Sequence, residues 1–587
     1  MPCVKNDPEL FLFLFLSFVS RHSHFVEPLS AISIAMAAKV KFAFGNLLRT
    51  SPGTKASSTP YMRKSQAWLP LVFALLLILG MITGYKLRER MPLTQGFFQN
   101  NQRSSLQETL DLIRLNYVDP VSTDSLADDA IEAMLAHLDP HSVFIPAKYL
   151  QEVNEDLQGN FEGIGVEFQI INDTVHVVNV FAGGPSANAG MRLGDKFLKV
   201  GDSAVAGNGI TSQRIKRLLR GPGASTVSIT VLSGTTTRVI RVVRGTIPLY
   251  SVDATYMIDD TTGFIHLNKF STTSYEECMA AFEKLKAKGM KKLIFDLRDN
   301  GGGILGEAVD ICDEFLDEDK MIVYTQGLRQ PKVEYHCRRP GLFENGRLVI
   351  LVNERSASAS EVIAGAIQDW DRGTIIGRRT FGKGLVQEQF NLSGGAALRL
   401  TVARYYTPAG RSIQKSYANG RSAYDHEVLD RYTTGEIINA DTVKISQGVA
   451  FKTKGGRTVY AGGGITPDIF VAMDTTGFIT DVSPLFENQH FGKFIYQYYI
   501  QHKPEFDRYK SAAEFSSRYQ AGNETFEALR QYISANKIDL PELPEKDRIE
   551  MTKRVKTWMA RQIWGMPGYY EVSNEYDLTV QKALEVK

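Results

Sequence analysis

Between residues 247 and 473, short apolar runs alternate with amphipathic segments, and this alternation restricts the fold more than any other feature. The apolar runs have the length and composition of buried strands, and the segments between them have helical periodicity. The predicted strands are Phe264–Leu267, Lys292–Leu297, Leu348–Val352 and Thr374–Ile376, and the predicted helices are Tyr275–Lys288, Leu305–Phe315 and Ser360–Asp369. Because such alternation is typical of α/β architecture, we predict an α/β core over residues 247–473.

The stretches on either side of this core have other patterns. Residues 91–157 carry apolar side chains at helical three-to-four spacing, and residues 474–587 are also helical in pattern. Residues 158–246 instead follow a period of two. Short strands are predicted there at Val166–Ile170, Val175–Val180, Val227–Leu232 and Arg238–Val243, with a short helix at Ser212–Arg220. This pattern predicts a small, partly open barrel within an α+β protein of several domains.

One segment near the N-terminus predicts a membrane anchor. Ala67–Tyr85 has no charged residue, and its length is near the minimum for a bilayer-spanning helix. Charged residues follow it instead of a cleavage site, which favours an uncleaved signal-anchor over residues 62–90 and disfavours a removed signal peptide. A buried core helix is the alternative. Met62 opens the anchor in the usual way, so we expect translation to start there or at Met36 and residues 1–61 to be an artefact.

Composition excludes some functional classes. Apolar residues make up 43% and charged residues 22% of the chain, as in a globular protein with a core. The net charge is +2 and the basic run Lys284–Lys292 is interpreted as a solvated helix end, so no nucleic-acid partner is expected. None of the four cysteines forms a C-x-x-C pair, so no metal site is predicted. Buried free thiols are preferred over a bridge from Cys312 to Cys278 or Cys337.

The segment LVNERSASASEVIAGAIQD (residues 351–369) carries the strongest local signal of chemistry. An apolar strand, a turn of small residues and a helix follow one another, and Ser358 stands where the helix begins. Free N–H groups and positive potential at that position can stabilise an oxyanion beside a nucleophile. The alternative is an inert helix cap, because Ser358-x-x-Glu361 also fits the capping box. Taken alone, the pattern favours the cap.

A lysine between two glycines makes the nucleophile interpretation of Ser358 more favourable than the helix cap. Thr380-Phe381-Gly382-Lys383-Gly384 is a mainly apolar segment, and its lysine taken alone is typical of a loop residue. A serine nucleophile needs a base, however, and a lysine serves as one only when it is neutral. Its free pKa of about 10.4 can fall toward about 7–8 on burial. Gln387, four residues on, is placed to hold the amine.

Two glycine-containing segments complete the pattern. Asp296–Gly303 (DLRDNGGG) follows a predicted strand, and its three glycines allow a tight turn with outward N–H groups, although alone it is typical of a bland turn. Gly163-Ile164-Gly165-Val166 opens another strand. Its N–H groups are suited to a carboxylate, and the strand that follows is suited to pair with an added peptide.

Together these motifs resemble the C-terminal processing peptidases, also called tail-specific proteases. The resemblance covers residues 110–468 and consists of eight motifs in the family's order: NYVDP (116–120), LDPHS (138–142), GIGV (163–166), DLRDNGGG (296–303), SASASE (356–361), TFGKGLVQ (380–387), LTVARYYTPAGRSIQ (400–414) and GGGITPD (462–468). Lys383 follows Ser358 by 25 residues, which is the family's own spacing and selects Ser358 over the neighbouring serines.

The resemblance implies the catalytic roles. Ser358 would be the nucleophile, Lys383 the general base and Gln387 its orienting partner. The N–H groups of Ala359 and Gly302 would form the oxyanion hole. The reaction implied is acyl transfer through an acyl-enzyme that water hydrolyses, with no metal or cofactor.

The resemblance also implies the architecture and two further residues. The core at 247–473 is expected to be crotonase-like, of the ClpP/crotonase type, with a PDZ domain inserted at 158–246. Asp369 takes a place sometimes counted as a third catalytic member, but it ends the predicted helix, so we prefer a structural role. Arg220 matches a PDZ arginine that couples substrate binding to activation.

The function expected is a serine endopeptidase that cleaves envelope proteins recognised by apolar C-terminal tails. The signal-anchor would hold it as a single-pass protein of a bacterial inner membrane, with the catalytic region in the periplasm. The terminal helical segments leave a homo-oligomer or an adaptor open as partners.

Three other interpretations remain. A histidine-based triad has one candidate within a family motif, His141, for which a surface role is preferred. A non-catalytic PDZ scaffold is disfavoured because Ser358, Lys383 and Gln387 are all present. An acyl-thioester enzyme of crotonase-like fold would leave the GIGV groove and the anchor unexplained.

Overall fold

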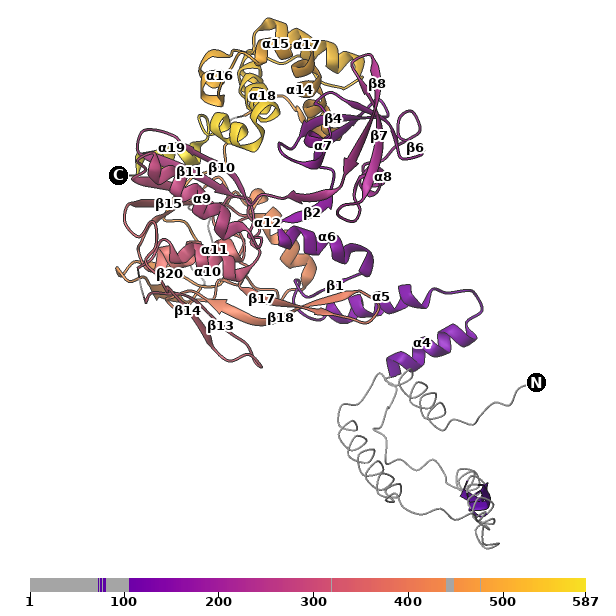
Figure 1. Ribbon diagram of the computed structural model, residues 1–587. Coiled ribbons are helices and arrows are strands. Elements are labelled where there is room, and N and C mark those ends of the chain that lie inside the picture. The colour runs from indigo at the N-terminus through magenta and orange to yellow at the C-terminus, as the bar shows by residue number, and fades with distance from the viewer. Residues whose placement is uncertain are drawn as a thin grey trace, which may run out of the picture. The chain divides into compact units, whose positions relative to one another are not determined.

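The computed structural model in Figure 1 describes residues 72, 74–76, 78–80, 105–317, 319–439, 448–475 and 477–586. The chain divides into two compact units, Met1–Ser104 and Ser105–Lys587. In the first unit the described residues are helical. The predicted extension 1–61 and most of the predicted signal-anchor 62–90 lie outside the described residues. Among the residues that are described, no helix is both long and apolar enough to span a bilayer.

A six-stranded sheet forms the centre of the second unit. Its order is β10-β11-β12-β15-β16-β21, and every neighbouring pair except β10 with β11 is parallel. The strands are β10 (Val252–Met257), β11 (Thr262–Leu267), β12 (Lys292–Asp296), β15 (Arg347–Val352), β16 (Thr374–Gly377) and β21 (Ile469–Phe470). The four strands predicted from continuous apolar runs are confirmed, because parallel strands of this kind are buried on both faces.

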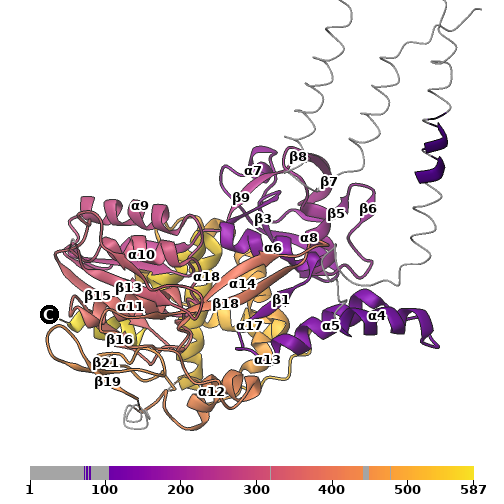
Figure 2. The same ribbon diagram turned by 90° about the horizontal axis from the view of Figure 1, so that it is seen from below.

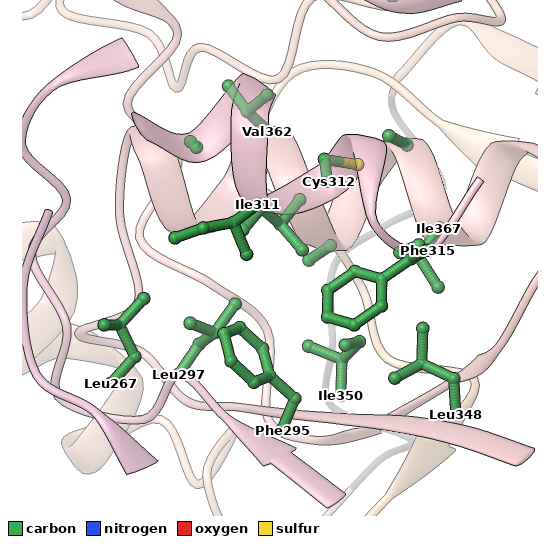
Figure 3. Packing of buried hydrophobic residues seen from close by; sticks show 14 of the residues in the cluster. Leu267, Phe295, Leu297, Ile311, Cys312, Phe315, Leu348, Ile350, Val362 and Ile367 are labelled. Carbon is green, nitrogen blue, oxygen red and sulfur yellow. The ribbon is translucent and has the colours of Figure 1, made fainter. Parts of the chain in front are cut away.

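Helices cover both faces of this sheet. On one face lie α9 (Ser274–Ala287), α10 (Leu305–Asp313) and α11 (Ala359–Asp369), which confirm the three predicted helices. Figure 3 shows the packing of α10 and α11 on the sheet, where Phe295 and Ile350 lie in one buried cluster with Phe315 and Ile367. Cys278, Cys312 and Cys337 are buried free thiols, as preferred from the sequence.

The opposite face is covered by α19 (Leu578–Glu585), whose Val580 and Ala583 join a buried cluster with sheet residues. The prediction that the basic run Lys284–Lys292 is solvated is wrong at its last residue. Lys292 is not solvated but 7% exposed, and its Nζ donates to Val586 O at 2.7 Å and to Leu584 O at 3.1 Å. The lysine begins a buried strand, so it bonds the carbonyl groups that α19 brings to it.

A second, antiparallel sheet joins the N-terminal helical region to the core. Its order is β1-β18-β13-β14, and β17 pairs with β18. The strands are β1 (Val143–Ile145), β13 (Met321–Gln326), β14 (Val333–His336), β17 (Leu385–Asn391) and β18 (Ala397–Tyr406). The preceding and flanking helices are α4 (Ser105–Asn116), α5 (Thr123–Leu135) and α6 (Ala147–Gln158). Since β1 pairs with β18, the LDPHS motif before β1 lies beside the core.

The PDZ domain is a separate sheet in the order β3-β4-β5-β7-β8, with β6 on β5. Its elements are β3 (Val166–Ile171), β4 (Thr174–Val180), α7 (Pro185–Asn188), β5 (Lys196–Val200), β6 (Ser203–Ala204), α8 (Ser212–Leu219), β7 (Thr226–Ser233) and β8 (Thr236–Val243). A ribbon of β2 (Asn160–Gly163) and β9 (Gly245–Pro248) connects it to the core. The strands and the helix predicted from the period-two pattern are confirmed.

The remaining elements are an insertion in the core and a helical C-terminal domain. The insertion contains α12 (Arg421–Thr433), β19 (Ala450–Lys452) and β20 (Thr458–Tyr460). The C-terminal domain contains α13 (Ser483–Phe486), η3 (Glu487–Gln489), α14 (His490–Gln501), α15 (Lys503–Phe506), α16 (Ala512–Arg518), α17 (Asn523–Ala535) and α18 (Glu545–Ser573). Helix α18 breaks at Gly565, where φ is +70°. Figure 2 shows this domain from a second direction.

Candidate active site

The turn between β15 and α11 holds Ser358 in a conformation that few residues adopt. Ser358 is the N-cap of α11, with φ 57° and ψ −113°. A non-glycine residue at positive φ is strained and persists only where its surroundings fix it. The neighbouring serines provide such contacts, because Ser356 Oγ donates to Leu297 O at 2.7 Å and Ser360 Oγ donates to Asn300 O at 2.9 Å. The sequence therefore anchors both sides of Ser358 to the preceding glycine turn.

Glu361 connects the segments that carry Ser358 and Lys383. Its Oε2 accepts the backbone N–H of Ser358 at 2.9 Å and that of Lys383 at 2.8 Å. Its Oε1 accepts Gly382 N at 2.8 Å and Thr380 Oγ1 at 2.5 Å. The residue is fully buried, and burial raises the pKa of its carboxyl to about 7 against the effect of these donors. Glu361, the glutamate of the predicted capping box, thus also holds the lysine loop.

A tyrosine bridges the same two segments from the other side. Tyr405 Oη donates to Ser358 O at 3.0 Å and also to Lys383 O. The side chain is 2% exposed and comes from β18. Glu361 and Tyr405 together therefore fix the backbones of Ser358 and Lys383 relative to each other.

The Lys383 amine lies in a half-buried position with a neutral partner. Its Nζ donates to Gln387 Oε1 at 3.1 Å, and Gln387 Nε2 in turn donates to His141 O. Burial lowers the pKa of Lys383, and the nearby positive charge of Arg399 lowers it further. Within the described residues Lys383 forms no ion pair and no hydrogen bond to Ser358 Oγ. The pairing of Lys383 with Gln387 that the sequence predicted is present.

The glycine turn packs directly against Ser358. At Gly302, with φ +96°, a Cβ would lie 2.7 Å from Ser358 Cβ and 3.0 Å from Ala359 N, so only glycine allows this approach. The two predicted oxyanion donors are therefore neighbours. One detail departs from the prediction of an outward N–H, because Gly302 N donates to Oδ1 of the fully buried Asn300 at 2.8 Å.

His141 is half-buried beside the lysine, so the preferred surface role was wrong. Its Nε2 lies 2.7 Å from Tyr424 Oη, and its carbonyl accepts Gln387 as described. Burial and then the charge of Lys383 lower the pKa of His141 to about 4. No hydrogen bond of the described residues joins His141 to Ser358. The imidazole is therefore a neutral neighbour of the lysine and not the base of a triad.

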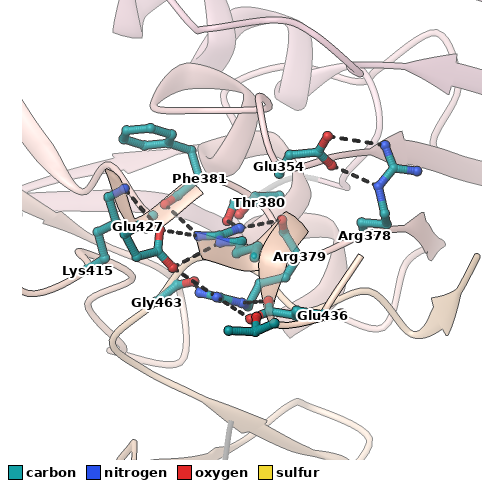
Figure 4. Close-up of polar contacts among 12 residues, drawn as sticks. Glu354, Arg378, Arg379, Thr380, Phe381, Lys415, Glu427, Glu436 and Gly463 are labelled. Atoms are coloured by element: carbon teal, nitrogen blue, oxygen red, sulfur yellow. Dashed lines mark hydrogen bonds and ion pairs between the residues drawn. The ribbon is translucent and has the colours of Figure 1, made fainter. Parts of the chain in front are cut away.

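The core insertion supports the lysine loop, which the sequence did not predict. Figure 4 shows this network. Arg379 pairs with Glu436 at 2.5 Å and with Glu427 at 3.1 Å, and Lys415 Nζ lies 3.0 Å from Glu427. Arg431 Nη1 donates at 2.9 Å to the carbonyl oxygens of Arg379 and of the residue after it. Since these partners are distant in sequence, no local pattern marks them.

Asp369 lies at the opposite end of α11 from Ser358, about 15 Å along a helix of 11 residues. Its carboxylate is 2.7 Å from Arg411 Nη2, both side chains are 1% exposed, and it also accepts Ala409 N at 3.0 Å. The structure does not bring it to the lysine. Its place among the catalytic candidates is therefore corrected to the structural role that we preferred.

The PDZ candidates lie at one end of β3. Gly165 has φ +73°, and the carbonyl groups of Ile164 and Gly165 accept the backbone N–H groups of Ser186 and Phe181, after β4, at 2.9 Å and 3.2 Å. Among the described residues β3 pairs with β4 alone, so its other edge has no strand partner there. Arg220, after α8, lies 2.9 Å from Glu155 of α6, and its guanidinium is 4.7 Å from the centre of the Phe161 ring. Arg220 thus links the PDZ domain to the N-terminal helical region.

Sequence comparison identifies the class of the catalytic core. Residues 261–420 match peptidase family S41, and residues 482–565 match a family of unknown function, DUF8443. The carboxy-terminal-processing protease of Bartonella bacilliformis is 32% identical over 335 residues, which cover 55% of this chain and 76% of the relative. A protein of Staphylococcus epidermidis named "Probable CtpA-like serine protease" is 30% identical over 377 residues, covering 62% of this chain and 75% of the relative.

Solved structures give matches of the same kind. The photosystem II D1 C-terminal processing protease is 27% identical and covers 63% of this chain and 86% of its own, with a TM-score of 0.33. The PDZ domain of the carboxy-terminal protease of Vibrio cholerae, solved with a peptide, is 30% identical and covers 15% of this chain and 99% of its own, with a TM-score of 0.15.

The S41 match and the curated relatives define a serine protease, a hydrolase. This chain belongs to the carboxy-terminal-processing protease family. A non-catalytic scaffold and an acyl-thioester enzyme are therefore set aside.

Proposed function

We propose that the chain is an endopeptidase in which Ser358 is the nucleophile and Lys383 the general base, and that it selects substrates by their C-terminal tails at the PDZ domain. One observation carries the proposal: the half-buried Lys383 bonds a neutral amide, and Glu361 holds its loop to the backbone of Ser358. A lysine amine in such surroundings loses its proton more easily than one in water, which a base for serine requires.

The reaction follows from these positions. Neutral Lys383 takes the proton of Ser358 as the hydroxyl attacks the scissile carbonyl, and the resulting oxyanion lies at the N-terminus of α11. The N–H of Ala359 is one donor to it, and that of Gly302 becomes the second once it leaves Asn300. The lysine then protonates the leaving amine, and water attacks the acyl-enzyme with the lysine again as base.

The arrangement is that of a resting enzyme. Ser358 Oγ and Lys383 Nζ are not hydrogen bonded among the described residues, and Gly302 N–H is bonded to Asn300. Catalytic hydrogen bonds often form only when substrate is bound. A connection from the PDZ domain is available, since Arg220 bonds Glu155 on α6, which follows β1 and the LDPHS motif. His141 of that motif accepts Gln387, the partner of Lys383.

We further propose that the chain acts on envelope proteins with apolar tails. The supports are the free edge of β3, which suits an added peptide strand, and the apolar run Ala67–Tyr85, which suits a single-pass anchor in a bacterial inner membrane. The catalytic region would then face the periplasm.

The experiment uses the full chain in detergent micelles with an unfolded protein that ends in an apolar tail. Fragments are followed by mass spectrometry for the wild type, Ser358→Ala, Lys383→Ala and, as a control away from the site, Ser517→Ala, which changes an exposed serine of α16. We expect the wild type and Ser517→Ala to cut and the other two variants to be inactive. Cutting by Ser358→Ala would show that the nucleophile is another residue.

A further inference from the structure

A cavity of about 730 Å³ lies between the PDZ domain and the helical C-terminal domain. One wall is the edge that would receive a peptide, formed by residues 166–170 of β3 and by Ser212 and Lys216 of α8. The opposite wall is formed by α14 and α18, with Phe491 and Trp558 among its residues. Its volume is in the range of ligand sites, which is about 300–1,000 Å³.

Direct contacts fix the two walls relative to each other. Gln562 Nε2 of α18 donates to Val178 O of β4 at 2.9 Å, and Tyr496 of α14 is buried in a cluster with Ile171 and Val178. Gly492 lies beside the same edge, since a Cβ there would lie 3.4 Å from both Gln169 Nε2 and Trp558 Cζ3. The C-terminal domain therefore packs against the PDZ sheet beside the peptide edge.

The cavity wall contains an acceptor without a donor. Gln169 Oε1 is buried and has no hydrogen-bond partner within the part of the chain that the structure describes. An unsatisfied buried carbonyl oxygen costs about 1–3 kcal/mol, so such groups usually indicate a missing partner. A peptide N–H or a polar side chain that enters the cavity would supply the donor.

The alternation of β3 decides which part of a tail meets which wall. Val166, Phe168 and Ile170 pack on the PDZ core, so Glu167 and Gln169 point to the other face, toward the C-terminal domain. A peptide strand added to β3 alternates in the same way. Its last side chain would enter the PDZ domain, and its penultimate side chain would face α14 and α18.

We propose that the C-terminal helical domain is the second half of the tail-binding site and selects the penultimate residue of the substrate. This inference rests on the tail recognition proposed above and extends it to the region that matches a family of unknown function. The accessible aromatic ring of this wall is Trp558, on which Arg561 stacks at 5.4 Å, whereas Phe491 behind it is 1% exposed. A large apolar or aromatic penultimate side chain fits this surface, because it would bury apolar area against the Trp558 ring.

The occupant is a substrate tail and not the C-terminal segment of this chain. Residues 578–585 form α19 on the catalytic sheet, and Lys292 holds Val586 O there. That segment is therefore engaged elsewhere.

The test measures binding of fluorescein-labelled decapeptides to the full chain in micelles, in the Ser358→Ala background that prevents cleavage. One pair of peptides ends in valine and carries phenylalanine or serine at the penultimate position. A second pair differs only in the last residue, valine or serine. The variants are Trp558→Leu, Arg561→Ala and the matched control Arg548→Ala, an arginine of α18 that stacks on Phe526 at 5.1 Å outside the cavity.

We expect the chain to prefer penultimate phenylalanine about tenfold, as burial of a ring against a partly open wall would give. Trp558→Leu and Arg561→Ala should reduce that preference to about threefold or less, while selection of the last residue and the whole behaviour of Arg548→Ala stay unchanged. An unaltered penultimate preference in Arg561→Ala would overturn the inference. So would a chain that selects the last residue and ignores the penultimate one. A chain that binds none of the peptides overturns tail recognition as well, whereas the cleavage experiment decides the catalytic residues separately.

Discussion

Two lysines lie close together in this molecule and have different partners. Lys415 is 4% exposed, pairs with Glu427 at 3.0 Å and lies 3.9 Å and 4.2 Å from the ring centres of Phe381 and Tyr424. Lys383 is half-buried, and among the described residues its amine bonds an amide and pairs with no carboxylate. Burial lowers the pKa of both amines. The bonded Glu427 opposes this effect at Lys415, whereas at Lys383 the charge of Arg399 adds to it and only the unbonded charges of Glu361 and Asp139 oppose it.

The difference teaches what a basic lysine needs. Burial alone does not make an amine a proton acceptor, because a carboxylate and two aromatic faces stabilise the ammonium form of Lys415. The carboxylates near Lys383 bind other groups. Glu361 accepts backbone N–H groups, and Glu427 binds Lys415, Arg379 and Arg431. What remains for Lys383 is a neutral amide, and this is the feature that separates a base from a structural cation.

The largest effect expected is loss of cleavage in Lys383→Met. Removal of a general base costs about 10²–10⁴-fold in rate, and here we expect at least about 10³-fold. Folding should change little, since the side-chain amine of Lys383 gives up one hydrogen bond, to Gln387, and no ion pair among the described residues. Peptide cleavage and thermal unfolding, measured on one preparation, test both halves. A melting temperature that falls with activity would mean that Lys383 is structural like Lys415.

The pH dependence sharpens the comparison next. Since the neutral amine is the active form, kcat/KM should rise with pH, by about tenfold per unit below the pKa of Lys383. Because burial lowers that pKa, the midpoint should lie below the value of about 10.4 for lysine in water. Initial rates with a fluorogenic peptide between pH 6 and about pH 10 would measure it. A rate that falls with rising pH contradicts the assignment of the base.

Lys415→Met should show the reverse of Lys383→Met. The loss of the ion pair and of two ring contacts is expected to lower the free energy of unfolding by about 1–3 kcal/mol. Cleavage should fall by less than about tenfold, because the amine takes no part in proton transfer. Urea unfolding followed by tryptophan fluorescence gives the stability. Equal stability of Lys415→Met and wild type would remove the distinction drawn here.

The smallest effect is expected from Gln387→Leu. The substitution removes the acceptor that orients the amine but leaves the amine in place. We expect kcat to fall about three- to tenfold, which corresponds to about 0.7–1.4 kcal/mol, with KM unchanged. Gln389→Leu, two residues along the same strand, is the matched control. A larger change in KM than in kcat would assign Gln387 to substrate binding.

Much of the core could be predicted from the sequence because its signals are local. The strands β11, β12 and β15 are continuous apolar runs, and α11 begins at a small-residue turn. A few neighbouring residues are therefore enough to predict each element. The pairing of Lys383 with Gln387 could also be predicted locally, because the two residues are only four positions apart at the start of β17. Their motif order and the spacing to Ser358 pointed to the family, and the curated relatives confirm it.

The remainder depends on partners that are far apart in the chain. His141 bonds Tyr424, 283 residues away, so nothing near His141 indicates that it is half-buried. Arg431 holds the lysine loop from a position 52 residues after Arg379 and 51 residues after Thr380 in the sequence. Glu361 looked like a simple cap, since the capping box does not reveal that the same carboxylate accepts Lys383 N. The helical pattern of residues 474–587 likewise predicted helices but not that the PDZ domain lies beside α14 and α18.

The C-terminal domain leaves the catalytic sheet after β21 and returns to it as α19. Both ends of the domain are therefore attached to the same six-stranded sheet, one through β21 and the other through α19. The contacts of Gln562 and Tyr496 with the PDZ sheet then tie that sheet to the catalytic sheet. A force that pulls a bound tail would be carried into the catalytic sheet through these two attachments as well as through the ribbon of β2 and β9.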